Sequence, residues 1–312
     1  MNVRVARAIC CLLAVGCSLP ATTFYVTVAG LGGEAEYEQR FQSWAQEIDK
    51  LVRAGGPDAR SEALCGQAAT RARLESVLGG IAREATPADA LIVMLIGHGG
   101  LDGSDYKMNL PGPDISAAQL AALLDRIPAG RQLVVNMTSA SGASIAALRK
   151  ENRAVITATK SGTEENATVF ARYWVEALRD PAADTDKNEV VSALEAFRYA
   201  DQKTAKFYET QKRLATEHAL LEDTGKGEGV RSPSPENGEG LLAARFAVVR
   251  LGAAQRAAQA PAKRKLLERK EALEAEIDRL KYEKSAMLLE EYRKRLTALL
   301  LELAKTQAEL DK

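Results

Sequence analysis

The sequence has few of the residues that carry reactive side-chain chemistry. Its 312 residues include two histidines and four cysteines. Cys10, Cys11 and Cys17 lie near the N-terminus, which leaves Cys65 as the one cysteine in the body of the chain. A lone thiol cannot form an internal disulfide or a zinc site, so we expect Cys65 to pack as a small apolar side chain.

The chain also lacks an excess of charge of either sign, and it has few aromatic residues. Lys and Arg together number 42, as do Asp and Glu, so the formal net charge is zero. This balance argues against broad electrostatic binding of nucleic acid, which needs a basic face. Aromatic residues make up 5% of the chain and apolar residues 46%, so Leu, Ala, Val and Ile must form most of the core.

The first 22 residues have the pattern of a secretory signal peptide. Arg4 and Arg7 precede a short apolar run, Ile9 to Gly16, and small residues follow. The run is too short for a permanent membrane-spanning helix. The pattern predicts an exported protein, located in the periplasm or anchored to the envelope membrane of a bacterium.

Two routes of processing fit this segment. Ala14-Val15-Gly16-Cys17 resembles a bacterial lipobox, in which Cys17 would carry a lipid and attach the protein to the membrane. Ordinary cleavage would instead fall near Ala21. A buried first strand is the third interpretation, but the two arginines and the separate strand pattern that begins at Phe24 disfavour it.

Residues 23–252 alternate between strand patterns and amphipathic helix patterns, which predicts one α/β domain. Continuous apolar runs such as Ala90 to Ile96 are typical of strands buried on both faces of a parallel sheet. Alternation of strand and helix predicts a mostly parallel sheet with helices on both faces. The expected strands are 24–29, 90–96, 132–136, 154–158 and a last one, 241–251, that closes the sheet. The expected helices are 34–52, 69–83, 115–126, 143–150, 166–178 and 190–218.

A linker at 253–262 and one long helix at 263–312 are expected to follow the domain. Leu273, Ile277 and Leu280 begin a heptad pattern whose register slips once, near Met287 to Leu289. The pattern predicts a coiled coil, formed with a second copy of the chain or with another helical protein. The other interpretation is a solvated helix that folds back on the domain.

Small and polar residues follow two of the predicted buried strands. One strand leads into Gly97-His98-Gly99-Gly100, and the next leads into Thr138-Ser139-Ala140-Ser141-Gly142. Sites in open α/β sheets form outside the carboxyl ends of the strands, so we expect His98 and Ser139 to lie within reach of each other. A hydroxyl beside an imidazole, among exposed peptide N–H groups, is a layout for nucleophilic catalysis.

The residues around these strand ends resemble the legumain branch of the caspase-like cysteine peptidases. The matching segments are LIVMLIGHGGLDGSDYKMNLPG, ISAAQLAALLDRIPAGRQLVVNMTSASGAS and AVITATKSGTEENATVFARYWVEAL. The resemblance covers roughly residues 24–251, and it implies a caspase-like three-layer sandwich. It also implies that His98 is the catalytic histidine, that Gly99 is the oxyanion-hole glycine and that Ser141 and Gly142 are the family's Ser-Gly pair. Thr138, which precedes Ser139, and Thr159, which follows the expected strand 154–158, are further candidates for binding.

The chain departs from this family at the nucleophile, because Ser139 stands where the family has cysteine. One hypothesis is an inactive or impaired peptidase homologue that binds a polypeptide or assembles a complex in the cell envelope. The other is an active endopeptidase-like hydrolase, with Ser139 as nucleophile and His98 as general acid and base. A thiol ionises with a pKa of about 8.5, whereas a serine hydroxyl needs a base in direct contact, which favours the inactive homologue. The loop at residues 30–33 holds no arginine, so no substrate preference is implied.

A calcium loop is a further possibility in the segment that begins at Asp184. Asp184, Asp186, Asn188 and Glu195 are its candidate ligands, at spacings that follow an EF-hand pattern. Glu189 stands where that pattern requires glycine, and no helix pattern enters the loop. The alternative is a polar turn that caps the following helix. The sequence indicates no other cofactor.

Overall fold

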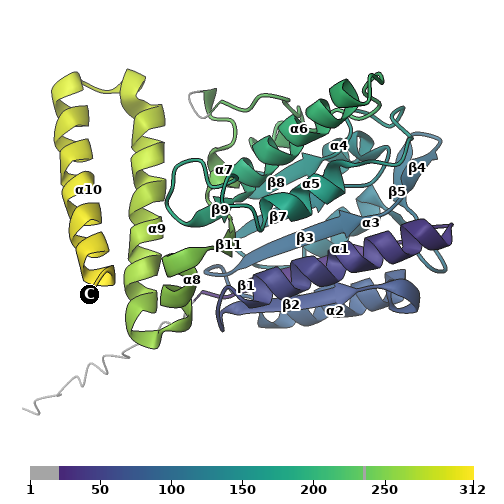
Figure 1. The fold of residues 1–312 in the computed structure, drawn as a ribbon, viewed down its shortest axis with the longest axis horizontal. Coiled ribbons are helices and arrows are strands. Elements are labelled where there is room, and N and C mark those ends of the chain that lie inside the picture. Colours follow the sequence, from purple (N-terminus) through teal and green to yellow (C-terminus); the bar gives the residue numbers. More distant parts are fainter. Residues whose placement is uncertain (1–20, 235–236) are drawn as a thin grey trace, which may run out of the picture.

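A six-stranded sheet forms the centre of the computed structural model, which describes residues 21–234 and 237–312 (Figure 1). Its strand order is β10-β8-β7-β3-β1-β2. All neighbours pair in parallel except β10, which runs antiparallel to β8. The strands are β1 (Thr23–Ala29), β2 (Ala59–Leu64), β3 (Ala90–Ile96), β7 (Arg131–Asn136), β8 (Arg153–Thr157) and β10 (Leu220–Glu222). The predicted α/β class with a mostly parallel sheet is confirmed.

Helices cover both faces of this sheet and complete a three-layer sandwich. One face carries α1 (Ala35–Arg53), α5 (Phe170–Ala177) and α6 (Ala193–Thr210), and the other carries α2 (Arg71–Glu84), α3 (Ala117–Leu124) and α4 (Ile145–Leu148). The central strand β3 shows why both faces need cover. Leu91, Val93 and Leu95 join one apolar core, whereas Ile92, Met94 and Ile96 join the other. Successive side chains of a strand point to opposite faces, so an unbroken apolar run requires a helical layer on each side.

Two small sheets lie beside the main one. The first contains β4 (Gly99–Asp102), β5 (Asp105–Met108) and β6 (Ile115–Ser116), and the second pairs β9 (Val190–Ser192) with β11 (Ala247–Arg250). The strand expected at 241–251 is therefore different in the structure. Its first residues form the short helix α7 (Leu241–Ala244), and β11 pairs with β9 and not with the main sheet. The helix expected over 190–218 is shorter in the structure. Its first three residues form β9, and the helix itself, α6, ends at Thr210.

Helices also replace the expected linker, and the expected continuous C-terminal helix is divided. The linker range 253–262 falls mostly in α8 (Gly252–Gln259). It is followed by α9 (Pro261–Tyr282), a short 3-10 turn (Glu283–Ala286) and α10 (Leu289–Leu310). The break contains Met287 and Leu288 in extended conformation, where the heptad register slips, and α10 returns along α9 (Figure 1). The slip in the heptad register thus marks the point where the chain reverses direction. The apolar residues before the slip belong to α9, and those after it belong to α10.

The helical hairpin α9–α10 is tied to the domain through α9. Arg250 of β11 forms an ion pair with Glu271 of α9, and Lys270 donates to the carbonyl oxygen of Asn188 at 2.9 Å. The predicted signal segment, Cys17 included, lies outside the described residues apart from its last two positions. Among the helices of residues 21–234 and 237–312, none has the length and apolar character needed to cross a membrane.

Candidate active site

The ends of β3 and β7 bring the two predicted site segments to one edge of the sheet. The two strands pair in parallel, with Leu95 opposite Asn136, and the N–H of Met137 donates to the carbonyl oxygen of Leu95 at 2.9 Å. His98 and Ser139 follow these strands by a few residues. The expected juxtaposition of the two segments is therefore present in the fold.

The hydroxyl of Ser139 is held by the backbone of Gly99. Its Oγ atom accepts a hydrogen bond from the Gly99 N–H at 3.1 Å and donates one to the Gly99 carbonyl oxygen at 2.9 Å. Ser139 is 2% exposed, so this pair of bonds is shielded from water. No hydrogen bond joins Ser139 to His98 in the described part of the chain. The hydroxyl therefore lacks the contact with a base that a serine nucleophile requires.

His98 sits against aromatic rings of α1. Its imidazole makes edge contacts with Tyr37 and Phe41, with ring centroids 4.9 and 5.2 Å apart. Burial lowers the pKa of His98, and the backbone of Gly32 and the charge of Glu34 oppose this shift only in part. The ring is therefore neutral at pH 7, and it has no hydrogen-bonded carboxylate among the described residues to orient it.

Thr138 lies inside a buried network of hydroxyl and amide groups. Its Oγ1 atom is 2.6 Å from the hydroxyl of Tyr106 and donates to Oδ1 of Asn136 at 2.8 Å. Tyr106 also donates to that amide oxygen, and burial raises the pKa of Tyr106 to about 12, so the phenol stays neutral. Thr138 is fully buried, and its hydrogen bonds position the loop that carries Ser139; the predicted binding role of Thr138 stays a prediction. Sequence reasoning missed Tyr106, because β5 is a short strand without a recognisable motif.

Ser141, Gly142 and Thr159 connect the loop after β7 to the loop after β8. Oγ of Ser141 accepts hydrogen bonds from the N–H groups of Ala158 and Thr159, both at 3.1 Å. The N–H of Gly142 donates to Oγ1 of Thr159 at 2.9 Å. A Cβ atom on Gly142 would lie 2.3 Å from backbone atoms of the next loop, so only glycine fits there. These residues, predicted to bind a ligand, hold the loop that carries Ser139.

The residue after Ser139 has a strained backbone. Ala140 has φ of 56°, a left-handed conformation that is costly for a side chain with Cβ, and its N–H donates to the carbonyl oxygen of Glu164 at 2.8 Å. The carboxylate of Glu164 is hydrogen-bonded to Nδ1 of His218. The backbone of Glu164 thus holds the residue after Ser139, and its side chain holds His218. His218, one of two histidines in the chain, was not predicted from the sequence as a site residue.

Three of the four candidate calcium ligands come together in the structure. Asp184, Asp186 and Glu195 offer carboxylate oxygens that lie within 4.8 Å of one another, and the N–H of Asn188 donates to Asp184 and Asp186. Burial and the nearby charge of Glu195 raise the pKa of Asp186 to about 6. Carboxylate oxygens are the ligands that calcium prefers, so the donor set fits this ion chemically.

These carboxylates already bind groups of the protein. Glu195 accepts hydrogen bonds from Thr185 through Oε1 and from the N–H and hydroxyl of Ser192 through Oε2. The latter bonds form a capping box at the start of α6. Glu189, at the position that needs glycine, has φ of 66°. The observed contacts are those of the polar turn that the sequence analysis gave as the alternative, and calcium binding stays a prediction.

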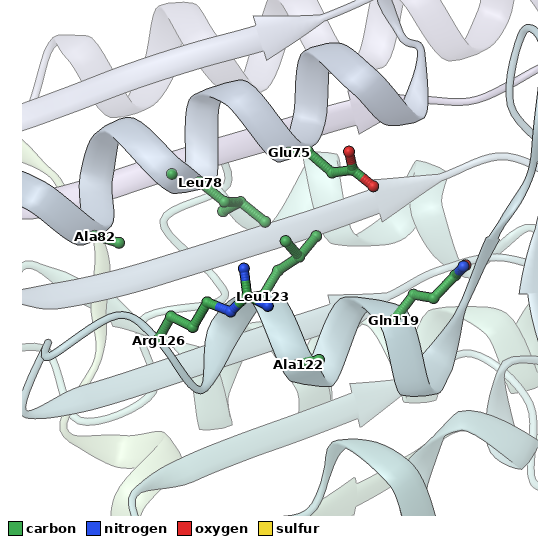
Figure 2. Close-up of a pocket in the computed structure, with 8 residues that line it drawn as sticks. Glu75, Leu78, Ala82, Gln119, Ala122, Leu123 and Arg126 are labelled. Carbon is green, nitrogen blue, oxygen red and sulfur yellow. The ribbon is translucent and has the colours of Figure 1, made fainter.

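Neither of two cavities in the described structure contains His98 or Ser139. Figure 2 shows a shallow one of about 400 Å³ between α2 and α3. Leu78 and Leu123 point toward each other across it, and Glu75 and Arg126 lie at its rim. The larger cavity lies at the opposite edge of the sheet from the candidate active site.

Comparison with known structures gives distant likenesses, which include a caspase and a bacterial protein. No protein-family model matches the chain, and no curated protein matches its sequence. The chain is similar to the Drosophila initiator caspase Dronc, with 10% identity and a TM-score of 0.43 over 67% of this chain and 82% of the caspase. It is also similar to protein GSU0716 from Geobacter sulfurreducens, with 12% identity and a TM-score of 0.46 over 75% of this chain and 100% of that one. Both TM-scores lie below 0.5, so neither likeness assigns the chain to a family.

Proposed function

We propose that this protein is a peptidase-related domain of the caspase-like type that no longer cleaves peptides and that binds a polypeptide in the bacterial envelope. The bonding of Ser139 carries this proposal. Its hydroxyl donates to the carbonyl of Gly99 and not to an imidazole, so none of the described side chains is placed to remove its proton. The Gly99 N–H, which would bind an oxyanion, is bonded to the same hydroxyl.

The edge strand β4 supports binding of an extended polypeptide. The three-stranded sheet has the order β4-β5-β6, so β4 has a partner strand on one side only. Backbone groups of an antiparallel strand alternate between its two edges. Gly99 uses its groups on Ser139, and Leu101 therefore presents its N–H and carbonyl at the same edge. Its side chain is 39% exposed there. Addition of a strand to such an edge is a common mode of peptide recognition.

The alternative function is an endopeptidase-like hydrolase with Ser139 as nucleophile and His98 as general acid and base. The strained backbone at Ala140 favours it, since strain of this kind often occurs at reactive turns. For this function the side chain of Ser139 must leave Gly99 and reach His98.

Labelling with a serine-directed acyl probe tests the choice between these functions. We expect a fluorophosphonate to leave the purified wild-type protein unlabelled. We also expect the Ser139→Ala variant to bind the same polypeptide as the wild-type protein. Ser139→Cys is the companion variant, because a thiolate forms far more readily than an alkoxide. Peptide cleavage by this variant would show that the rest of the site is intact. Labelling of the wild-type protein that disappears in Ser139→Ala, and persists in Ser104→Ala, would establish the hydrolase instead. Ser104 is exposed and belongs to no part of the site.

A further inference from the structure

A cavity of about 1160 Å³ lies between the main sheet and α9. Residues at the amino ends of the parallel strands form one wall, and β11 and one side of α9 form the others. In Figure 1, α9 stands at this end of the domain, whereas β4 and β5 lie at the other end. The volume is slightly above the range of roughly 300–1000 Å³ that is usual for small-molecule sites. The cavity is therefore large enough to hold an organic molecule, and it is separate from the candidate active site.

Arg131 places a guanidinium group in this cavity, where no carboxylate of the described residues pairs with it. It is the first residue of β7, and its Nε atom is buried with no hydrogen-bond acceptor. Its described contact is with the face of Phe246, where Cζ lies 5.7 Å from the ring centroid. A buried donor without an acceptor is costly, because it has lost its bond to water. The site is thus short of an acceptor at this position.

Two more arginines increase the positive charge around Arg131. Burial and then the charge of Arg245 lower the pKa of Arg131, and Arg250 acts in the same direction. Glu271 is the carboxylate that opposes them, but its two oxygens already bind Nε and Nη2 of Arg250 at 2.7 and 2.8 Å. Asp58 also acts on Arg250, but it is paired with Arg264. Among the described residues, Arg131 and Arg245 therefore have no ion-paired carboxylate.

Two other acidic residues of the cavity, Asp186 and Glu274, interact with other side chains. Asp186 is influenced by Glu195 and Asp184, and Glu274 mainly by Lys270. None of them contributes to the shift of Arg131. The hydroxyl of Tyr25 is also engaged, since it donates to the carbonyl oxygen of Val248 at 3.1 Å. Among residues 21–234 and 237–312, the arginine corner therefore has no free carboxylate to serve as its acceptor.

We propose that this corner binds the oxyanion group, a carboxylate or a phosphate, of a small organic molecule. The terminal N–H groups of Arg131 donate to oxygens of that group, because the Nε atom has no exposed surface. Arg245, exposed just after α7, supplies the second positive charge. The side of α9 that carries Leu267 and Ala275 covers the remainder of the ligand.

Thermal unfolding of the full chain tests this site with two probes, inorganic phosphate and citrate. Each probe is titrated against sodium chloride of equal ionic strength, so that general salt effects cancel. We expect a saturable rise in the unfolding midpoint with at least one probe. A response to phosphate alone assigns a phosphate-bearing ligand, and a response to citrate alone assigns a carboxylate.

Three variants connect this response to the arginine corner. Arg131→Met should raise the dissociation constant of the probe by about tenfold or more, because it removes charge-assisted hydrogen bonds. Arg245→Gln, at an exposed position, should weaken binding without affecting folding, and it keeps the test decisive if Arg131→Met is unstable. Arg126→Met, in the hollow between α2 and α3, is the matched control. The proposal is overturned if neither probe stabilises the wild-type protein, or if Arg245→Gln binds as the wild-type protein does.

Discussion

The carboxyl of Asp186 shows how a single residue makes the stability of this fold depend on pH. Its pKa is near 6 in the folded protein, whereas the ordinary value of 3.8 applies in the unfolded chain. Below about pH 4 the group is protonated in both states, and the folded protein keeps its full stability. As pH rises from about 4 to 6, the unfolded chain releases its proton first, and the free energy of unfolding falls.

Asp186→Asn should remove this penalty. We expect the variant to be more stable than the wild-type protein by about 1 kcal/mol at pH 7, a value reduced for the solvent screening of an exposed loop. Near pH 3.5 the two proteins should be equally stable, since the aspartic acid is then neutral as well. Urea unfolding at several pH values measures the difference between them.

Exposed Asp105 provides the matched control, because Asp105→Asn makes the same substitution outside the carboxylate cluster of Asp184, Asp186 and Glu195. A difference between Asp186→Asn and wild type that does not change with pH would contradict the assignment. Stabilisation by calcium chloride, but not by magnesium chloride, that Asp186→Asn abolishes would establish the calcium loop and remove the polar-turn interpretation.

The helices and strands differ in how much of them the sequence could predict. The central strands and the flanking helices follow from buried apolar runs and helical periodicity, as in Ala90–Ile96. The edge strand β2 was missed because ARSEAL is polar and only partly buried. The three-residue strand β10 is too short to show a period. The turn after α9 contains neither glycine nor proline, so only the register slip marked it.

In the candidate site, the sequence predicts where the residues lie on the sheet, but it does not predict which atoms they contact. The ends of neighbouring parallel strands place His98 and Ser139 at one edge of the sheet, and this follows from topology alone. The rotamer of Ser139 depends on the backbone of Gly99, and the position of His98 depends on rings of α1 that are distant in sequence. Periodicity carries no information on such tertiary contacts.

The α9 helix should contribute to global stability, because its inner face is buried. Leu273 is 0% exposed. We expect Leu273→Ala to lower the free energy of unfolding by about 2–5 kcal/mol, the usual cost of deleting a buried leucine side chain. Leu301→Ala is the control in α10, since Leu301 is 59% exposed and should cost less than about 0.5 kcal/mol. Chemical denaturation followed by circular dichroism measures both. Equal, small effects would mean that α9 does not pack on its neighbours in solution.

The hairpin determines how whole molecules can associate. In Figure 1, α10 lies outermost, with α9 between it and the domain. Only Thr306 and Leu310 of α10 are buried, whereas Leu289, Leu300 and Leu301 are 47–59% exposed. Two hairpins packed through this surface would form a four-helix bundle, which is a stable arrangement for amphipathic helices. We therefore propose that α10 mediates self-association.

A double substitution of Leu300 and Leu301 with glutamate tests this proposal. The wild-type protein should have the mass of two 33.6 kDa chains in light scattering after size-exclusion chromatography. The double variant should have the mass of one, because charged side chains cannot be buried without partners. Exposed Glu290→Leu serves as the control for a change of charge on the same helix, and it should leave the dimer intact. A wild-type protein of one chain's mass, or a double variant that keeps the mass of two, would show that this surface of α10 does not join copies of the chain.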